Sequence, residues 1–180
     1  MKKVLLIAAF AVFGLGISNA QETSFGVLGG FSIVSMDFDF GDFASGSDSE
    51  TGFHIGAFAD LGLSDQFSIQ PELAYTMVKD LSFFNINVIA KYYVADGFNI
   101  QAGPQIGLAG GDLIDYWDDL SDDFSKMNLQ LAIGVGYDFT EELFAQARYG
   151  FQLNNHYTGD VDDVHLKFNT ISVSVGYKFM

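Results

Sequence analysis

The most regular feature of this chain is an alternation of apolar with polar or small residues, which continues to its last residues. From Ile171 to Phe179 every second residue is apolar, and serine, glycine or lysine stands between them. A repeat of two is typical of a β-strand whose two faces meet different surroundings. The alternation recurs and predicts about eight strands, with apolar faces over Phe25 to Ile33, Phe53 to Leu61, Phe67 to Met77, Phe84 to Val94, Phe98 to Leu108, Met127 to Phe139, Leu143 to Leu153 and Ile171 to Phe179.

The connections between these segments alternate in length. Three are short turns, at Gly62 to Gln66, Ala95 to Gly97 and Thr140 to Glu142. Three are predicted as long loops, at Met36 to Glu50, Gly110 to Lys126 and Asn154 to His165. Only Val78 to Phe83 is short where a long loop is expected. Short turns on one side and longer loops on the other are typical of transmembrane β-barrels.

The residues between the apolar positions, on the other face of each strand, distinguish a soluble barrel from a transmembrane one. A soluble lipocalin-like barrel also alternates, with its apolar face inside, but its water-facing side would carry many lysines and glutamates. Here the second face is mostly neutral and rich in amides and glycine, which suits a narrow, hydrated interior where backbones approach closely. Leu28 and Ile89 also fall on this face and weaken the pattern. The neutral positions include Gly26, Gly30, Ser32, Ser68, Gln70, Asn85, Asn87, Asn99, Gln101, Gln105, Asn128 and Gln130.

The N-terminus predicts export. Lys2 and Lys3 precede an uncharged apolar run from Val4 to Ile17, and Ser18-Asn19-Ala20 is a small-residue cleavage pattern. The run is shorter than the roughly 20 residues that a spanning helix needs, so a membrane anchor is the weaker interpretation. We therefore interpret residues 1–20 as a signal peptide and residues 21–180 as one mature domain.

Charge and cysteine content exclude several functions. Without the predicted leader, six basic residues face 23 acidic ones, a formal charge of −17. Phosphate binding needs clustered lysine and arginine, so nucleic acid is not an expected partner. The chain has no cysteine, which excludes disulfides, thiolate metal sites and cysteine nucleophiles.

These features together resemble the small eight-stranded outer-membrane β-barrels of porin-like type found in Gram-negative bacteria. The resemblance covers the signal peptide, the alternating strands, the acidic loops and the aromatic C-terminal end. It implies an all-β, closed antiparallel barrel with up-and-down topology, monomeric and without a cofactor. The implied partners are outer-membrane lipid, lipopolysaccharide and the barrel-assembly machinery, which would recognise Tyr177 and Phe179 as a C-terminal signal. Met180 is a departure, since the aromatic residue is commonly the last one.

Two prolines conflict with a closed barrel, in which every strand is paired on both sides. Pro71 and Pro104 lie inside predicted strands, and proline has no N–H to donate. We expect a β-bulge at each. The alternative is that the prolines mark the edges of an open barrel.

Two of the few inward-facing charges are predicted to meet. Glu72 and Arg148 each lie five residues into a strand that runs in the same direction, and their strands are four apart. In a barrel of eight strands this separation places them across the interior at similar depth. Because buried charges need partners, we predict an ion pair that obstructs the interior.

The acidic residues concentrate in the predicted loops, and carboxylates are suited to Ca²⁺ or Mg²⁺. In the predicted loop from Gly110 to Lys126 the acids recur at spacings of three and four around the only tryptophan, which suggests a short amphipathic cap that binds a divalent ion or a partner. None of the acidic runs has the spacing of an EF-hand, and a solvated acidic surface is the alternative. The candidate residues are Asp115, Trp117, Asp118, Asp119 and Asp122.

The sequence favours a structural or surface-interaction role through the acidic loops. A narrow pore for small solutes is the alternative, and a soluble periplasmic ligand-binding barrel or a lipid-modifying barrel enzyme is less expected. His54, His156 and His165 are the only histidines, and a Ser-His-acid arrangement requires a geometry that spacing does not show. We predict that the protein is not an enzyme.

Overall fold

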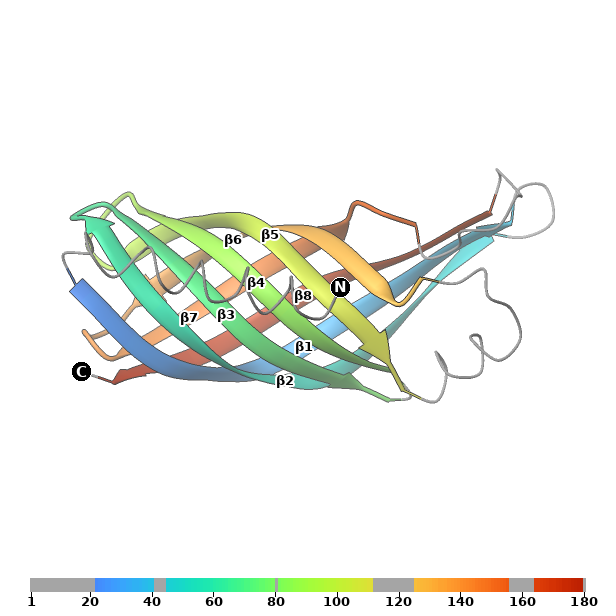
Figure 1. The fold of residues 1–180 in the computed structure, drawn as a ribbon, viewed down its shortest axis with the longest axis horizontal. Helices are drawn as coiled ribbons and strands as arrows, with labels where there is room; N and C mark the ends of the chain where they lie inside the picture. The colour runs from blue at the N-terminus through green and yellow to red at the C-terminus, as the bar shows by residue number, and fades with distance from the viewer. Residues whose placement is uncertain (1–21, 41–44, 80, 112–124, 156–163, 180) are drawn as a thin grey trace, which may run out of the picture.

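Each predicted alternating segment forms a β-strand in the computed structural model, which describes residues 22–40, 45–79, 81–111, 125–155 and 164–179. Neighbouring strands pair antiparallel in chain order, and β1 also pairs with β8, so the sheet closes into a barrel (Figure 1). The predicted fold class is confirmed. The strands are β1 (Glu22–Phe40), β2 (Ser45–Ser64), β3 (Phe67–Val78), β4 (Leu81–Tyr93), β5 (Phe98–Gly110), β6 (Met127–Asp138), β7 (Leu143–Gln152) and β8 (Val164–Phe179).

The two ends of the barrel differ in their connections. The connections β2–β3, β4–β5 and β6–β7 are short and lie at the end where β8 finishes, which we call the turn end (Figure 1). The opposite end, which we call the loop end, carries the connections predicted to be long, and between β3 and β4 the chain turns at Lys79 with a positive φ of 47°. In the part of the chain that the structure describes, no helix has the length and hydropathy to cross a bilayer.

The predicted apolar face points outward. Leu131, Ile133 and Val173, for example, are 39%, 47% and 53% exposed although they lie in the middle of the sheet. Ala59 and Leu61 share this parity but are buried, and Ala59 lies directly opposite the large Phe25 of β1. An apolar band outside and a closed hydrogen-bond ladder are what lipid demands, because lipid offers no partner to an unpaired backbone group.

The prolines are accommodated without bulges, so that prediction is wrong. Pro71 pairs with Val88 of β4 and Pro104 pairs with Leu131 of β6, and the register is unchanged on both sides of each proline. The second neighbour of the Pro71 strand is β2, and the second neighbour of the Pro104 strand is β4. On that side the pairing is interrupted over two residues at each proline, and the same register then resumes. A missing N–H costs one ladder bond, and local separation of two strands accommodates that loss without an extra residue. The irregularity recorded in β2 lies instead between Gly62 and Ser64.

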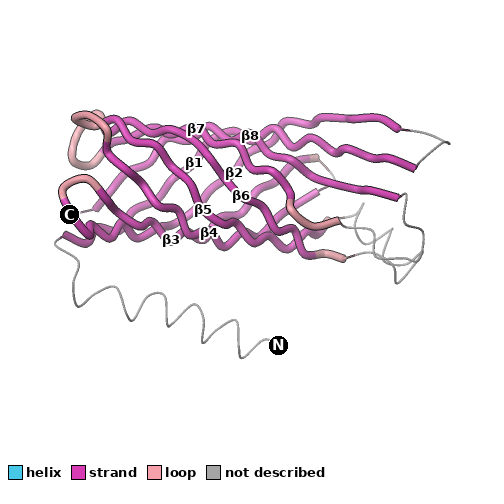
Figure 2. Tube along the Cα trace, turned by 90° about the horizontal axis from the view of Figure 1, so that it is seen from above, coloured by secondary structure: helices cyan, strands magenta, loops and turns pink. Residues whose placement is uncertain are grey.

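Three strands continue beyond the rest of the barrel at the loop end. β1, β2 and β8 have 19, 20 and 16 residues, while the others have 10 to 13. They form a three-stranded sheet in the order β8–β1–β2 that projects past the other strands (Figures 1 and 2). We call this part, residues 36–40, 45–52 and 164–169, the sheet extension.

The sheet extension corrects the prediction of a long loop from Met36 to Glu50. Met36 pairs with Asp48, and the ladder continues to the pair of Asp39 with Ser45. The apolar positions of β1 change here from odd to even numbers, with Met36, Phe38 and Phe40 alternating with two aspartates, while Ser45 to Gly52 of β2 carry no apolar side chain. A pattern search that relies on apolar alternation therefore assigns the segment to a loop.

Candidate functional site: the barrel interior and the sheet extension

The structure brings Glu72 and Arg148 together across the interior. Arg148 Nη1 and Nη2 donate to Glu72 Oε2 and Oε1, both at 2.8 Å. The side chains are 2% and 4% exposed, and they extend from β3 and β7, which are four strands apart. The two parallel bonds form the bidentate geometry in which a guanidinium recognises a carboxylate most strongly.

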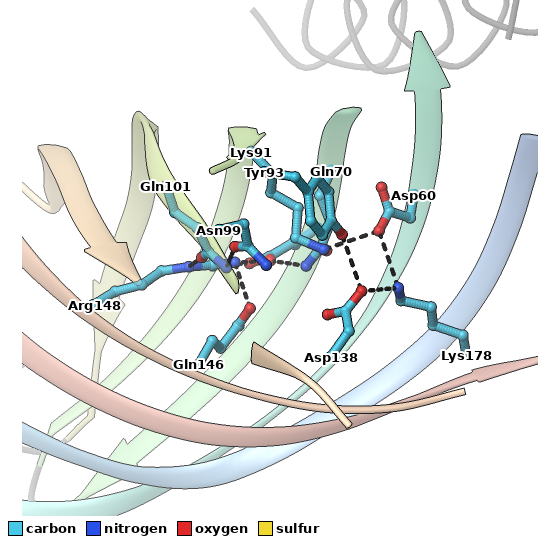
Figure 3. Close-up of polar contacts among 11 residues, drawn as sticks. Asp60, Gln70, Lys91, Tyr93, Asn99, Gln101, Asp138, Gln146, Arg148 and Lys178 are labelled. Atoms are coloured by element: carbon cyan, nitrogen blue, oxygen red, sulfur yellow. Dashed lines mark hydrogen bonds and ion pairs between the residues drawn. The ribbon is translucent and has the colours of Figure 1, made fainter. Parts of the chain in front are cut away.

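Amide side chains complete the hydrogen bonding of this pair. Glu72 accepts from Gln70 Nε2 at 2.5 Å and from Asn87 Nδ2 at 2.9 Å. Arg148 donates to Gln101 Oε1 at 2.6 Å and to Gln146 Oε1 at 2.9 Å (Figure 3). A buried ion pair recovers its desolvation cost only when its remaining donors and acceptors are bonded. The amide-rich inner face, which the sequence indicates, thus supports the pair and fixes its geometry.

A second group of charges lies nearer the turn end. Lys91 contacts Asp60 at 2.9 Å, and Lys178 contacts Asp138 at 2.8 Å and Asp60 at 3.8 Å. Tyr93 donates its hydroxyl to Asp138 at 3.0 Å (Figure 3). None of these charges was paired from the sequence, and their partners lie on strands that are not neighbours.

The charges of the described interior balance. Three acids, Asp60, Glu72 and Asp138, are matched by Lys91, Arg148 and Lys178. The formal charge of −15 for the whole chain therefore arises outside the barrel interior. A neutral, mutually bonded interior favours stable packing and offers no net field to draw ions of one sign.

An apolar cluster lies beside the turn-end charges. Phe58 and Phe144 stack edge to face at 5.4 Å between ring centroids, and Leu28 packs with them. The ammonium groups of Lys91 and Lys178 lie 5.2 Å and 5.6 Å from the Phe144 ring, within cation–π range. Phe58 lies directly opposite Glu72 in the ladder, so the cluster adjoins the central ion pair as well.

Glycines create the space for these rings. Phe58 lies directly opposite Gly26 in the ladder, and Phe144 lies opposite Gly176. A Cβ at either glycine would overlap the facing ring. The sequence contains a signal for this packing that the sequence analysis missed. A phenylalanine at an inward-facing position of one strand, opposite a glycine on the neighbouring strand, indicates an aromatic ring that fills the barrel interior.

A second apolar cluster closes the loop end. Its inward-facing members come from β1, β3, β4, β5 and β8, and Phe83 and Phe168 form its centre with ring centroids 5.7 Å apart. The inner face, predicted to be mostly neutral and amide-rich with a few apolar residues, thus gathers most of its apolar residues into two clusters. The members of the loop-end cluster are Val34, Val78, Phe83, Ala109 and Phe168.

A small cavity of about 50 Å³ lies between the Glu72–Arg148 pair and the loop-end cluster. Among the described residues, Asn87 Oδ1 and Asn128 Oδ1 border it and have no hydrogen-bond partner. This volume accommodates a few waters, which would satisfy such acceptors. The cavity is too small for a drug-sized ligand, since those occupy roughly 300–1,000 Å³.

His54 lines the same cavity without the surroundings of a catalytic base. Its Nδ1 contacts Ser32 Oγ at 2.8 Å and its Nε2 contacts Ser174 Oγ at 2.7 Å. A triad requires an acid on one ring nitrogen and a nucleophile on the other, whereas here both nitrogens face hydroxyls. His156 lies outside the described residues, and His165 is described only as a strand residue paired with Asp39.

The sheet extension has one open edge. Ser45 to Gly52 of β2 pair with β1, but pairing with β3 begins only at Phe53, so the other side has no strand neighbour among the described residues. The edge of β8 is different, because Phe168 donates its N–H to Gln152 Oε1 and accepts from Gln130 Nε2 at 2.7 Å. Side chains thus satisfy the β8 edge at this point, while the β2 edge from Ser45 to Ser49 has no strand partner among the described residues.

The contacts described above do not test the remaining predicted site residues. Asp115, Trp117, Asp118, Asp119 and Asp122 lie outside the described residues, so the predicted cap stays a prediction. Tyr177 and Phe179 point outward near the end of β8, with 46% and 50% exposure. Their role as an assembly signal also stays a prediction.

Comparisons with known proteins agree with this architecture. The family model described as the outer membrane protein beta-barrel domain matches residues 5–179. Ail, the attachment invasion locus protein of Yersinia pestis, solved with the heparin analogue sucrose octasulfate, is 16% identical, with a TM-score of 0.50 over 88% of this chain and 100% of that one. Neisserial surface protein A is 19% identical, with a TM-score of 0.48 over 88% and 100%.

OprG of Pseudomonas aeruginosa is 15% identical, with a TM-score of 0.46 over 89% of this chain and 98% of that one. No curated protein sequence matches the chain. At these identities the likeness to the solved structures concerns the fold.

Proposed function

Because this chain belongs to the outer membrane protein beta-barrel domain family, it is an integral outer-membrane protein, and we propose that it serves in recognition at the cell surface. Short turns face the periplasm in such barrels, so the sheet extension projects outside the cell. The observation that carries the proposal is the β2 edge from Ser45 to Ser49, which has no strand partner on its second side among the described residues. An unpaired strand edge is a template for an extended segment of another protein.

The interior gives less support to the alternative of a solute pore. The Glu72–Arg148 pair crosses it, an apolar cluster lies on either side of this pair, and the cavity between them has about 50 Å³. Eight-stranded barrels in general have interiors filled by side chains. Passage of a solute would require several independent layers to move together.

Charge narrows the class of partner. The extension carries Asp37, Asp39, Asp48 and Glu50 against one lysine, Lys167, and the chain as a whole is strongly acidic. A sulfated polysaccharide of the kind represented by sucrose octasulfate, with which Ail was solved, would be repelled by such a surface. A basic protein with an extended segment fits both the charge and the open edge.

A first experiment compares conduction with adhesion. We expect the refolded protein to show no stepwise conductance in planar bilayers. We also expect cells that display it to adhere to immobilised basic extracellular proteins and not to immobilised heparin. Regular single-channel steps together with an absence of adhesion would favour the pore instead.

A second experiment tests the edge itself. Neighbouring residues of a strand direct their N–H groups to opposite sides, and proline has none. One of the two variants Gly46→Pro and Ser47→Pro therefore removes an N–H from the β2 edge that lacks a strand partner. The other removes an N–H that faces β1. We expect the edge variant to lose adhesion while the barrel still migrates as a folded species on unboiled gels. Adhesion that survives both substitutions would contradict edge pairing.

A further inference from the structure

A second cavity, of about 220 Å³, opens at the loop end above the apolar cluster. Val34 and Val78 belong to that cluster and also line this cavity, so the cluster forms its floor. Met36 and Leu81 pack against the cluster and form apolar walls. An apolar cavity of about 150 Å³ is enough to bind benzene in an engineered protein, so this one has room for a phenyl ring or a short alkyl chain.

The rim of this cavity is charged. Lys79 contacts Glu50 at 2.8 Å, and these side chains are 63% and 44% exposed. Asp48 Oδ1 accepts a hydrogen bond from the N–H of Ser49 at 3.0 Å. No ion pair of Asp48 is recorded among the described residues, so the rim of three ionised side chains has a net charge of −1.

We propose that this cavity is a binding site for a small organic cation that combines one ammonium group with one apolar group. The apolar group would occupy the floor formed by Val34 and Val78, and the ammonium would lie at the rim beside Asp48. An organic anion of the same shape meets the net negative rim, and a neutral apolar molecule gains nothing from it. The site uses inward-facing side chains, whereas the surface proposed above uses the backbone edge of β2, so either proposal can fail without the other.

Charge and volume together select the ligand class. The rim alone would hold any cation only weakly, because exposed charge pairs contribute little. The floor alone would not discriminate between an amine and a carboxylate. Discrimination between matched probes of opposite charge is therefore the measurement that decides the proposal.

The experiment uses the full mature protein in lipid nanodiscs, with empty nanodiscs as the blank for membrane partitioning. The probes are phenethylamine, 3-phenylpropionate as the matched anion, and methylammonium as the cation without an apolar group, followed by calorimetry and ligand-observed NMR. We expect saturable binding of phenethylamine alone. Equal binding of the anion, or no saturable binding of phenethylamine, would overturn the proposal.

Variants assign the binding to this cavity. Asp48→Asn should weaken phenethylamine binding about three- to fivefold, the range of an exposed charge pair. Met36→Trp should abolish it by filling the cavity from a half-buried position at the open mouth. Asp65→Asn, at an exposed turn of the opposite end, is the matched control and should leave binding unchanged.

Each variant is first checked for folding by its gel migration before and after boiling. Because Asp48→Asn changes an exposed residue, its fold should be retained even if Met36→Trp fails to assemble. Unchanged affinity in folded Asp48→Asn would place the amine elsewhere and overturn the assignment.

Discussion

Strands β8, β1 and β2 run through both the eight-stranded barrel body and the sheet extension, yet their surroundings differ between the two regions. Within the body each strand pairs on both sides, and the interior charges are matched three against three. In the extension the β2 edge has no strand neighbour among the described residues, and the rim charges are exposed. One hydrogen-bonded ladder therefore runs from a region where strands pair on both sides into one where the β2 edge has no strand partner among the described residues.

The surroundings explain the difference. In the bilayer core an unsatisfied backbone group costs several kcal/mol, so the body must close. Outside the membrane water satisfies the same groups, so an edge can remain open for a partner. Substitutions should therefore cost much in the body and little in the extension, and four predictions test this contrast from the largest expected effect to the smallest.

The largest effect is expected from breaking the central ion pair. Arg148→Met leaves the Glu72 carboxylate buried without its cation and should destabilise the barrel by about 3–5 kcal/mol. The double variant Glu72→Gln/Arg148→Met removes both charges and should cost less. Urea unfolding in lipid vesicles, followed by intrinsic fluorescence, measures each step of the cycle. A coupling energy near zero would mean that the two groups do not stabilise each other.

The next effect concerns the lipid-facing surface. Leu131 lies near the middle of β6 and is 39% exposed on the outer face, so Leu131→Arg places a charge near the bilayer midplane. The expected cost is about 2–4 kcal/mol. Leu143→Arg is the matched control, because Leu143 begins β7 at the turn end, where the cost should fall to about 0–1 kcal/mol. Equal costs at the two depths would contradict the placement of the membrane.

A smaller effect is expected from filling the space that a glycine leaves. Gly176→Ala places a Cβ against the Phe144 ring and should cost about 1–3 kcal/mol, the range of overpacked cores. In Gly29→Ala the new Cβ meets His54 O at an ordinary 3.5 Å. This control should unfold at nearly the urea concentration of the parent protein. A similar loss in both would indicate that strand flexibility, and not ring packing, determines the cost.

How much of this could be read from the sequence depends on what the pattern encodes. Parity fixes which face a residue occupies, and strand count fixes which strands are opposite, so Glu72 and Arg148 could be placed together. The charge group around Asp60 and Lys91 could not, because its pairing depends on how far side chains reach between strands that are neither adjacent nor directly opposite. Predicting the aromatic rings that fill the interior requires a comparison of two paired strands, as for Phe144 opposite Gly176.

The extension was missed for a different reason. Apolar alternation marks a strand only where one of its faces is apolar, and Ser45 to Gly52 carry no apolar side chain on either face. A polar strand in water leaves no periodic signal, so the segment resembles a loop in the sequence. The functional proposals therefore rest on the part of the fold for which the sequence pattern is least informative.

The smallest effect is expected at the cavity rim, where Lys79→Ala in the β3–β4 turn removes an exposed ion pair with Glu50 of the extension. Exposed pairs contribute about 0–1 kcal/mol, and salt screens them. We expect the loss in Lys79→Ala to disappear at about 1 M NaCl, where the Debye length falls to about 3 Å. The deficit of Arg148→Met should persist at the same salt concentration because that pair is buried.

Lys79→Gly separates charge from backbone strain at the same position. Lys79 holds a φ of 47°, which glycine adopts without the steric cost that other residues incur there. Lys79→Gly should therefore be more stable than Lys79→Ala, although both lack the ammonium group. If the two variants unfold at the same urea concentration, the turn is not strained. If either loses as much stability as Arg148→Met, the rim is as tightly coupled as the body and the contrast between the two regions fails.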